Sequence, residues 1–329
     1  MTKDLTAQLA AADLPADLKL KAEEMINYTD REQMNQYLNL ITALPWNKLS
    51  EDCLDLTKAK EVMDAHHHGM TEIKDKILEY LSVMTLTRGQ EGASRAPMLC
   101  LVGLVGTGKT TFARSIALAL NRAFVRIPFG GLGSALDLRG QSRLHPDAEP
   151  GLIVKALKRA KTRNPVILLD EIDRVTTNAN ADIMGVLVEL LDPEQNAQFT
   201  DHYLDFPFNL SDVLFVATAN NLRNIATAVL DRLEVLQMPS YTDSEKTIIA
   251  KDYILPKVLT ESGLSFDNLT IDDDVWPNIV RPLGFDAGLR TLERTIESIA
   301  HLLARSIVEG QVKHFHLTRE NIKKYLPNY

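Results

Sequence analysis

The middle of the chain alternates short apolar runs with helical patterns. The clearest runs are strand-sized and contain no polar residue, at positions 98–102, 166–169 and 213–217. Between them, apolar residues such as Phe112 and Ile116 recur four positions apart, which is the spacing of one buried helix face. Fully apolar strands that alternate with helices are typical of a parallel sheet covered on both faces. The pattern therefore predicts an α/β fold for this part of the chain.

The segments before this region predict helices and one loop. We assign residues 1–60 to a helical N-terminal arm, because Met34, Tyr37 and Ile41 lie on one face of a helix. Residues 88–96 are small and polar, and they predict a loop.

Beyond Pro239 the strand pattern does not recur. Thr242 and Glu245 make a capping box, the pairing of a hydroxyl and a carboxylate that begins a helix. Six apolar residues at spacings of three or four predict a long helix with one buried face: Leu289, Leu292, Ile296, Ile299, Leu303 and Ile307. We therefore predict an α/β domain at 61–240 and a small all-α domain at 241–329.

The composition is that of an ordinary globular protein and restricts the partners. The 329 residues are 45% apolar and 24% charged, which suits about two domains. With 36 basic and 44 acidic side chains the formal charge is −8, which disfavours capture of nucleic acid or of an anionic membrane. The chain has two cysteines, no N-terminal apolar segment and no apolar run of the ~20 residues that span a bilayer, so we expect a cytoplasmic protein.

A glycine-rich motif follows the first apolar run and precedes a helical pattern. Residues 103–110 read Gly-Leu-Val-Gly-Thr-Gly-Lys-Thr and fit the G-x-x-x-x-G-K-[ST] pattern of phosphate-binding loops. Glycines let successive N–H groups point into one concavity, the lysine reaches the β- and γ-phosphates, and the last hydroxyl can ligate Mg²⁺. The sequence therefore predicts a site for ATP and Mg²⁺ at Gly103, Gly106, Thr107, Gly108, Lys109, Thr110 and Thr111.

Polar side chains end the second and third apolar runs. Asp170 is predicted to hold the Mg²⁺ shell together with Thr110, and Glu171 to polarise a water for in-line attack on the γ-phosphate. Asn220 follows the third run, where an amide can hold that water. Taken alone, the carboxylates are also consistent with acidic residues at a strand end, and Asn220 with a turn residue.

These motifs together resemble the ATPase module of Lon-type AAA+ proteases. The similarity runs from about Leu20 to Tyr325. It is most specific at Leu-Asp-Pro-Glu-Gln-Asn (191–196), at Asp-His-Tyr-Leu (201–204) and along 210–220. The resemblance implies a P-loop AAA+ sheet sandwiched by helices, with a large nucleotide-binding domain followed by a small helical lid.

The resemblance also assigns roles to single residues. Lys109 and Thr110 fall on Walker A, and Asp170 and Glu171 fall on Walker B. The other matching positions are sensor 1 at Asn220, an arginine finger for a neighbouring subunit at Arg232, sensor 2 at Arg290, and adenine contacts at His68, Gly69 and Met70. The implied assembly is a homo-hexameric ring that couples ATP hydrolysis to the unfolding and translocation of unfolded or damaged proteins for degradation.

The sequence departs from the family in two places. We find no serine and lysine in the setting of the family's peptidase dyad, so we expect proteolysis to need a separate protease domain or chain. His145-Pro146-Asp147 stands where the family carries an aromatic–aliphatic–glycine tripeptide that grips the substrate. A rigid proline and an anion replace a flexible aromatic side chain, so we expect substrate threading to be weaker or lost.

Two other functions fit the motifs. One is a nucleic-acid-remodelling AAA+ ATPase. The acidic net charge and the stretches that specifically resemble Lon, at 191–196, 201–204 and 210–220, both argue against it. The other is a nucleotide-responsive scaffold that no longer translocates, which the altered tripeptide favours. We expect polypeptide partners, and neither a specific nucleic acid nor a membrane.

Overall fold

The computed structural model describes residues 9–326 except 11, 27, 88–97, 146 and 282–287. The predicted loop at 88–96 and Pro146 therefore lie outside the described residues. The chain divides into two compact units. Unit 1 comprises Met1–Met63, Lys74–Val102 and Thr110–Leu236, and unit 2 comprises Asp64–Ile73, Gly103–Lys109 and Gln237–Tyr329.

Unit 1 is built on a five-stranded sheet. In spatial order its strands are β2 (Phe124–Pro128), β3 (Val166–Asp170), β6 (Leu214–Ala219), β1 (Met98–Val102) and β7 (Leu233–Gln237). The pairs β2–β3, β3–β6 and β6–β1 are parallel. Strands β3 and β6 are buried at every residue, which explains their nearly continuous apolar sequences. The predicted α/β fold is confirmed.

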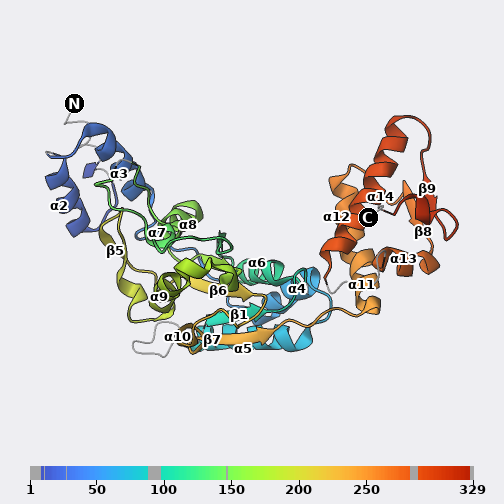
Figure 1. The fold of residues 1–329 in the computed structure, drawn as a ribbon, viewed down its shortest axis with the longest axis horizontal. Coiled ribbons are helices and arrows are strands. Elements are labelled where there is room, and N and C mark those ends of the chain that lie inside the picture. Colours follow the sequence, from blue (N-terminus) through green and yellow to red (C-terminus); the bar gives the residue numbers. More distant parts are fainter. Residues whose placement is uncertain are drawn as a thin grey trace. The chain divides into compact units, whose positions relative to one another are not determined.

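Helices flank this sheet (Figure 1). They are α4 (Leu56–His66), α5 (Thr71–Thr87), α6 (Lys109–Ala119), α7 (Leu136–Arg139), α8 (Leu152–Ala160), α9 (Asn180–Leu191) and α10 (Thr227–Leu230). Phe112 and Ile116, which the four-residue spacing placed on one helix face, are both fully buried. The helical period in the sequence therefore marks the side of α6 that packs into the core.

Among the described residues, the predicted N-terminal arm contains the helices α2 (Ala16–Met25) and α3 (Arg31–Ala43). The Asp30 carboxylate caps α3 by accepting the N–H groups of Glu32 at 2.9 Å and Gln33 at 3.4 Å. The helix face predicted from the sequence is buried, including Tyr37.

The arm packs on a two-stranded antiparallel hairpin of the same unit, β4 (Phe199–Asp201) and β5 (Phe206–Phe208). The Tyr37 hydroxyl donates to the Leu204 carbonyl at 3.1 Å, in the turn between the two strands. The Trp46 ring lies 4.9 Å from the Phe208 ring, centroid to centroid. These buried aromatic contacts anchor the arm to unit 1.

Unit 2 is mainly helical. Its helices in the C-terminal region are α11 (Asp243–Ile249), a π-helical turn (Ala250–Ile254), α12 (Leu255–Glu261), α13 (Trp276–Val280) and α14 (Arg290–Val308). Both halves of the capping box form at the start of α11, between Thr242 and Glu245.

The expectation of an all-α C-terminal domain needs one correction. Two three-residue strands, β8 (Leu269–Ile271) and β9 (Phe315–Leu317), pair in parallel. Each is too short to give an alternating pattern in the sequence, and the pairing joins segments more than forty residues apart. Nothing local in the sequence therefore marks these strands.

None of the described helices combines the length and the apolar character needed to cross a bilayer.

Candidate functional site

The predicted phosphate-binding loop, residues 103–109, curls around the side chain of its own lysine. Lys109 Nζ donates to the carbonyl oxygen of Gly103 at 2.6 Å and to that of Leu104 at 2.9 Å. The Thr107 hydroxyl donates to the same Leu104 carbonyl at 2.9 Å, and Thr107 is fully buried. The loop is therefore a tight turn that holds the Lys109 ammonium group against two of its own carbonyl oxygens. The helix α6 begins at the lysine itself.

The first turn of α14 closes on this loop. Gly106 has a φ of 83°, a left-handed conformation that glycine adopts without strain. Its carbonyl accepts the N–H of Leu289 at 3.0 Å. A β-carbon on Gly288 would lie 2.4 Å from the Val105 carbonyl oxygen, so this approach of the two backbones needs glycine. The contact brings Arg290, the exposed first residue of α14, close to the loop.

The residues predicted to contact adenine, 68–70, belong to the same unit and lie against the start of α11. A β-carbon on Gly69 would lie 3.5 Å from Glu245 Oε1, and the Tyr241 hydroxyl donates to Met70 Sδ at 3.7 Å. Unit 2 thus holds the predicted adenine contacts, the phosphate-binding loop and the predicted sensor 2 arginine.

In unit 1, Asp170 ends β3 as predicted, and two side chains bind its carboxylate. The Thr218 hydroxyl, on β6, donates to Oδ1 at 2.5 Å, and Arg126 Nε, on β2, donates to Oδ2 at 2.6 Å. The side chain of Asp170 is 6% exposed, whereas that of Arg126 is 51% exposed. The buried carboxylate is therefore held by a neutral donor inside the sheet and by a cation that reaches in from the surface.

Glu171 turns the chain out of the sheet. Its backbone is left-handed (φ 59°, ψ 50°), and its N–H donates to the Thr218 hydroxyl oxygen at 2.9 Å. Its carboxylate pairs with Arg174 Nη1 at 3.3 Å, and a β-carbon on Gly130 would lie 3.1 Å from Oε2. Thr218 thus links the two predicted Walker B residues, while the Glu171 carboxylate stays partly exposed, where water reaches it.

Asn220 directly follows β6, and Asp173 holds its backbone. The Asn220 N–H donates to Asp173 Oδ1 at 3.1 Å, and the N–H and side-chain amide of Asn221 donate to Oδ2 at 3.3 and 3.2 Å. Because β3 and β6 are parallel neighbours, their carboxyl ends bring Asp170, Glu171 and Asn220 to one edge of the sheet.

Arg232, the predicted arginine finger, is bound within its own chain. Its Nη1 donates to the Ala228 carbonyl at 2.8 Å and its Nη2 to Asp192 Oδ2 at 3.2 Å. Burial would raise the pKa of Asp192, but the hydrogen bonds from Arg232 and from the backbone of Glu194 and Gln195 outweigh it and lower the pKa. Asp192 is therefore an anionic partner for this arginine at neutral pH.

Pro146 of the altered tripeptide lies outside the described residues, but the structure shows how the surrounding loop is held. The Gln141 N–H donates to the Glu149 carbonyl at 3.0 Å, which closes the loop on itself. The Gly151 N–H donates to Asp201 Oδ2 at 2.7 Å. Asp201 is fully buried, and this burial raises its pKa against the opposing effect of its backbone hydrogen bonds. The ends of the loop are therefore pinned to the hairpin.

Sequence reasoning missed four residues that hold the predicted site. They are Thr218 and Arg126 at Asp170, Asp173 at Asn220, and Gly288 at the phosphate-binding loop. Only Asp173 carried a local signal, because it follows the two predicted Walker B carboxylates by two and three positions. Thr110 and Thr111 lie where expected, in the first turn of α6.

Comparison with known proteins adds independent findings. Residues 99–241 match the family model "ATPase family associated with various cellular activities (AAA)", and residues 260–315 match "Lon protease AAA+ ATPase lid domain". Lon protease of Lawsonia intracellularis is 43% identical over 98% of this chain, and Lon protease 1 of Bacillus subtilis is 39% identical over 98%. Lon protease of Clostridioides difficile is 44% identical over 88%.

The chain spans about two fifths of the length of these curated relatives, namely 40%, 42% and 36% of each. The two family models and the relatives agree with the P-loop, the α/β sheet and the helical C-terminal region described above. The chain therefore belongs to the AAA ATPase family, as an ATP-hydrolysing module of the type found in Lon proteases.

Proposed function

We propose that this chain binds ATP with Mg²⁺ and couples its hydrolysis to the unfolding and translocation of polypeptides, as one subunit of a homo-hexameric ring. The observation that carries the proposal is the phosphate-binding loop, which is tightly turned around Lys109 and closed by the first turn of α14. Because the relatives are named proteases, we further propose that the unfolded chain passes to a protease domain or partner.

The proposed roles follow from the chemistry of each side chain. The N–H groups of residues 103–109 and the Lys109 ammonium bind the phosphates, and Arg290 adds a second cation from the start of α14. Glu171 accepts a proton from the attacking water, and the Asn220 amide orients that water. His68, Gly69 and Met70 contact the adenine.

The residues also suit Mg²⁺. Among the described residues no group of three or more His, Cys, Asp or Glu side chains is arranged to hold a metal ion by itself. Mg²⁺ does not need such a group, because it usually keeps several waters and binds through one or two protein oxygens plus phosphates. Asp170 and the Thr110 hydroxyl would supply those oxygens. The ion, when bound, neutralises charge on the transferring phosphoryl group.

Two substitutions test the phosphate chemistry separately. Lys109→Ala removes the cation and should abolish binding of a fluorescent ATP analogue. Glu171→Gln keeps the shape of the site and should bind ATP normally with almost no turnover. Exposed residues provide the matched controls, Lys60→Ala and Glu261→Gln, and both should behave as the unmodified chain does. Unchanged affinity in Lys109→Ala would overturn the assignment of the loop, and normal turnover in Glu171→Gln would reassign the base.

A mixing experiment tests the ring. An arginine finger is typically worth ~10³–10⁵ in rate, so Arg232→Ala should bind ATP and lose turnover. Rings that also contain Lys109→Ala subunits should regain part of that turnover, because Lys109→Ala subunits still supply Arg232 to a neighbour's ATP. No recovery in rings whose mixed composition is confirmed by native mass spectrometry would argue against action between subunits.

Polypeptide coupling has its own readout. An unfolded protein such as casein should raise the rate of ATP hydrolysis if the chain works on polypeptides. An unchanged rate would favour the nucleotide-responsive scaffold, and firm binding of DNA in a gel shift at low salt would favour a nucleic-acid remodeller.

A further inference from the structure

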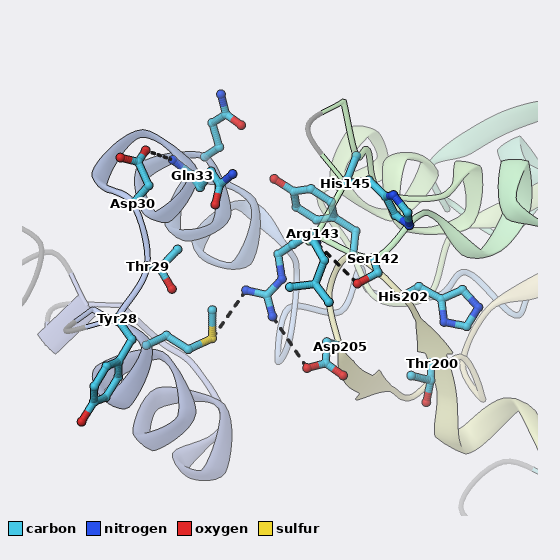
Figure 2. Close-up of a pocket in the computed structure, with 15 residues that line it drawn as sticks. Tyr28, Thr29, Asp30, Gln33, Ser142, Arg143, His145, Thr200, His202 and Asp205 are labelled. Atoms are coloured by element: carbon cyan, nitrogen blue, oxygen red, sulfur yellow. Dashed lines mark hydrogen bonds and ion pairs between the residues drawn. The ribbon is translucent and has the colours of Figure 1, made fainter.

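The arginines that pair with carboxylates in unit 1 differ in how firmly they are held. Arg143, which lines a pocket of about 560 Å³, is held from three sides (Figure 2). Its guanidinium carbon lies 4.0 Å from the centre of the Tyr37 ring, and its Nη1 donates to the thioether sulfur of Met25 at 3.5 Å. Its Nη2 lies 3.7 Å from Asp205 Oδ2, which makes an ion pair. These contacts together fix the side chain in place.

Arg126 is held at one point. Among the described residues its one hydrogen bond runs from Nε to Asp170 Oδ2, at 2.6 Å. A guanidinium has five N–H donors, so most of them are left for water, and the side chain is 51% exposed. The strand β2 that carries it also lies at the end of the spatial order of the sheet. Release of this arginine from the carboxylate therefore requires only that an exposed side chain rotates into water.

The register of β2 and β3 places Arg126 diagonally across from Asp170. Arg126 is opposite Leu168, and Pro128 is opposite Asp170. Because side chains two positions apart on a strand point to the same face, Arg126 shares a face with Asp170, and its long side chain reaches forward to the carboxylate. The contact therefore lies at the carboxyl end of the strands, where Glu171 and Asn220 also lie.

The two oxygens of the Asp170 carboxylate are held in different ways. Oδ1 accepts the hydroxyl of Thr218, which is fully buried on β6 and has no path to water while the sheet is intact. Oδ2 accepts Arg126, which can leave. The Asp170 side chain is only 6% exposed, and two cations on one oxygen repel each other. A metal ion that binds Oδ2 must therefore replace the guanidinium.

We propose that Arg126 is a positioning residue that holds the Asp170 carboxylate until Mg²⁺ takes Oδ2, so that Arg126 and Mg²⁺ compete for this oxygen. The proposal deepens the proposed function and rests on it, because that function brings Mg²⁺ to Asp170. Before the exchange, Arg126 neutralises a carboxylate whose burial without a partner would be costly. During the exchange, Arg126 turns into water while Thr218 keeps its hydrogen bond to Oδ1. Removal of Arg126 therefore strengthens binding that depends on Mg²⁺.

Two other roles of Arg126 lead to different expectations. If Arg126 orients Asp170 while the metal is bound, its loss weakens the binding that depends on Mg²⁺. If Arg126 attracts the nucleotide directly, as a positive charge, its loss weakens metal-free binding most, whether or not residue 170 carries a charge. Nucleotide affinity with and without Mg²⁺, measured with and without the Asp170 carboxylate, therefore separates the three roles.

The experiment titrates the full chain with a fluorescent, non-hydrolysable ATP analogue, once in EDTA and once in saturating Mg²⁺. The ratio of the second affinity to the first is called the Mg²⁺ effect. Arg126→Gln removes the cation, and Arg126→Lys keeps the charge but has fewer hydrogen-bond donors. The exposed Arg159→Gln is the matched control for the change in net charge. Arg126→Gln is also made in an Asp170→Asn background, where no carboxylate remains to compete for.

Arg126→Gln should increase the Mg²⁺ effect about tenfold, the lower end of what a hydrogen bond to a charged group contributes, because the arginine is half exposed. Arg126→Lys should give a value between those of the unmodified chain and Arg126→Gln. Arg159→Gln should leave the Mg²⁺ effect unchanged. In the Asp170→Asn background, Arg126→Gln should no longer alter it, because the two residues act through one contact.

A Mg²⁺ effect that is unchanged or smaller in Arg126→Gln would overturn the proposal. An increase that persists in the Asp170→Asn background would also overturn it, because Arg126 would then act on the nucleotide directly. Should Arg126→Gln fail to fold, Arg126→Lys decides: an increase supports the proposal, and an equal or smaller Mg²⁺ effect overturns it. If the unmodified chain binds no analogue in either buffer, the proposed function fails as well, whereas binding with an unaltered ratio refutes the competition alone.

Discussion

Thr218 gives the sharpest test of how the two predicted Walker B residues, Asp170 and Glu171, are held. It is fully buried, donates to the Asp170 carboxylate at 2.5 Å and accepts the Glu171 N–H at 2.9 Å. Thr218→Val keeps the shape and removes both hydrogen bonds. A hydrogen bond to a charged group contributes about 1.5–3 kcal/mol, and a buried donor left unpaired costs about 1–3 kcal/mol. Because Glu171 is partly exposed, we take the lower part of the sum of these two ranges. We therefore expect Thr218→Val to lower the free energy of unfolding by about 3 kcal/mol.

The two tryptophans of the chain allow unit 1 to be measured on its own. Trp46 lies in unit 1 and Trp276 in unit 2. In a Trp276→Phe background, tryptophan fluorescence during urea unfolding therefore reports on unit 1. Thr200→Val is the matched control, because Thr200 is an exposed strand threonine whose hydroxyl donates only to the nearby Gln198 carbonyl at 3.3 Å.

We expect the free energy of unfolding of unit 1 to fall by about 3 kcal/mol in Thr218→Val and by less than about 0.5 kcal/mol in Thr200→Val. ATP turnover should also fall in the first variant and not in the second. If Thr218→Val unfolds at the same urea concentration as the unmodified chain and keeps its turnover, the hydroxyl does not hold this site.

Other substitutions and conditions test unit 2 and the core. Gly288→Ala places a β-carbon 2.4 Å from the Val105 carbonyl and should weaken ATP binding about tenfold in a fluorescence titration, whereas Gly185→Ala, with no atom within 4 Å, should not. Hydrogen bonds from the Thr242 backbone and hydroxyl lower the pKa of Glu245, so their stabilisation is present above the ordinary carboxyl range near ~4.3 and is lost as the pH falls below it. Thr242→Ala should lower the free energy of unfolding of unit 2 by about 1 kcal/mol at pH 7, as measured by Trp276 fluorescence. The free energy of unfolding of this variant should also fall less steeply as the pH is lowered. Burial raises the pKa of Cys100 to about 12, so iodoacetamide should label this thiol only after urea unfolding.

Each of these predictions can be contradicted by a specific result. Equal ATP affinity in the two glycine variants would mean that α14 does not need its close contact with the loop. A pH dependence unchanged by Thr242→Ala would remove the capping box as its source, and labelling of Cys100 in the native protein would show that β1 opens readily.

Local patterns in the sequence determined much of this protein. The apolar runs located β1, β3 and β6 to within one or two residues, because a strand buried on both faces tolerates almost no polar side chain. The spacing of three and four located α6 and α14, because one helix face must be buried. The predicted phosphate-binding loop is a local pattern as well, since its proposed chemistry depends on consecutive residues.

The tertiary structure decided what holds these pieces in place. Thr218 reaches Asp170 across forty-eight positions, Gly288 approaches the phosphate-binding loop, and Arg143 stacks on Tyr37 from more than a hundred positions away. No periodicity records such pairs, because each residue type is compatible with many local structures and acquires its role only from a partner distant in sequence. The sequence therefore predicts which residues carry the proposed chemistry, whereas packing between distant segments determines which neighbours orient them.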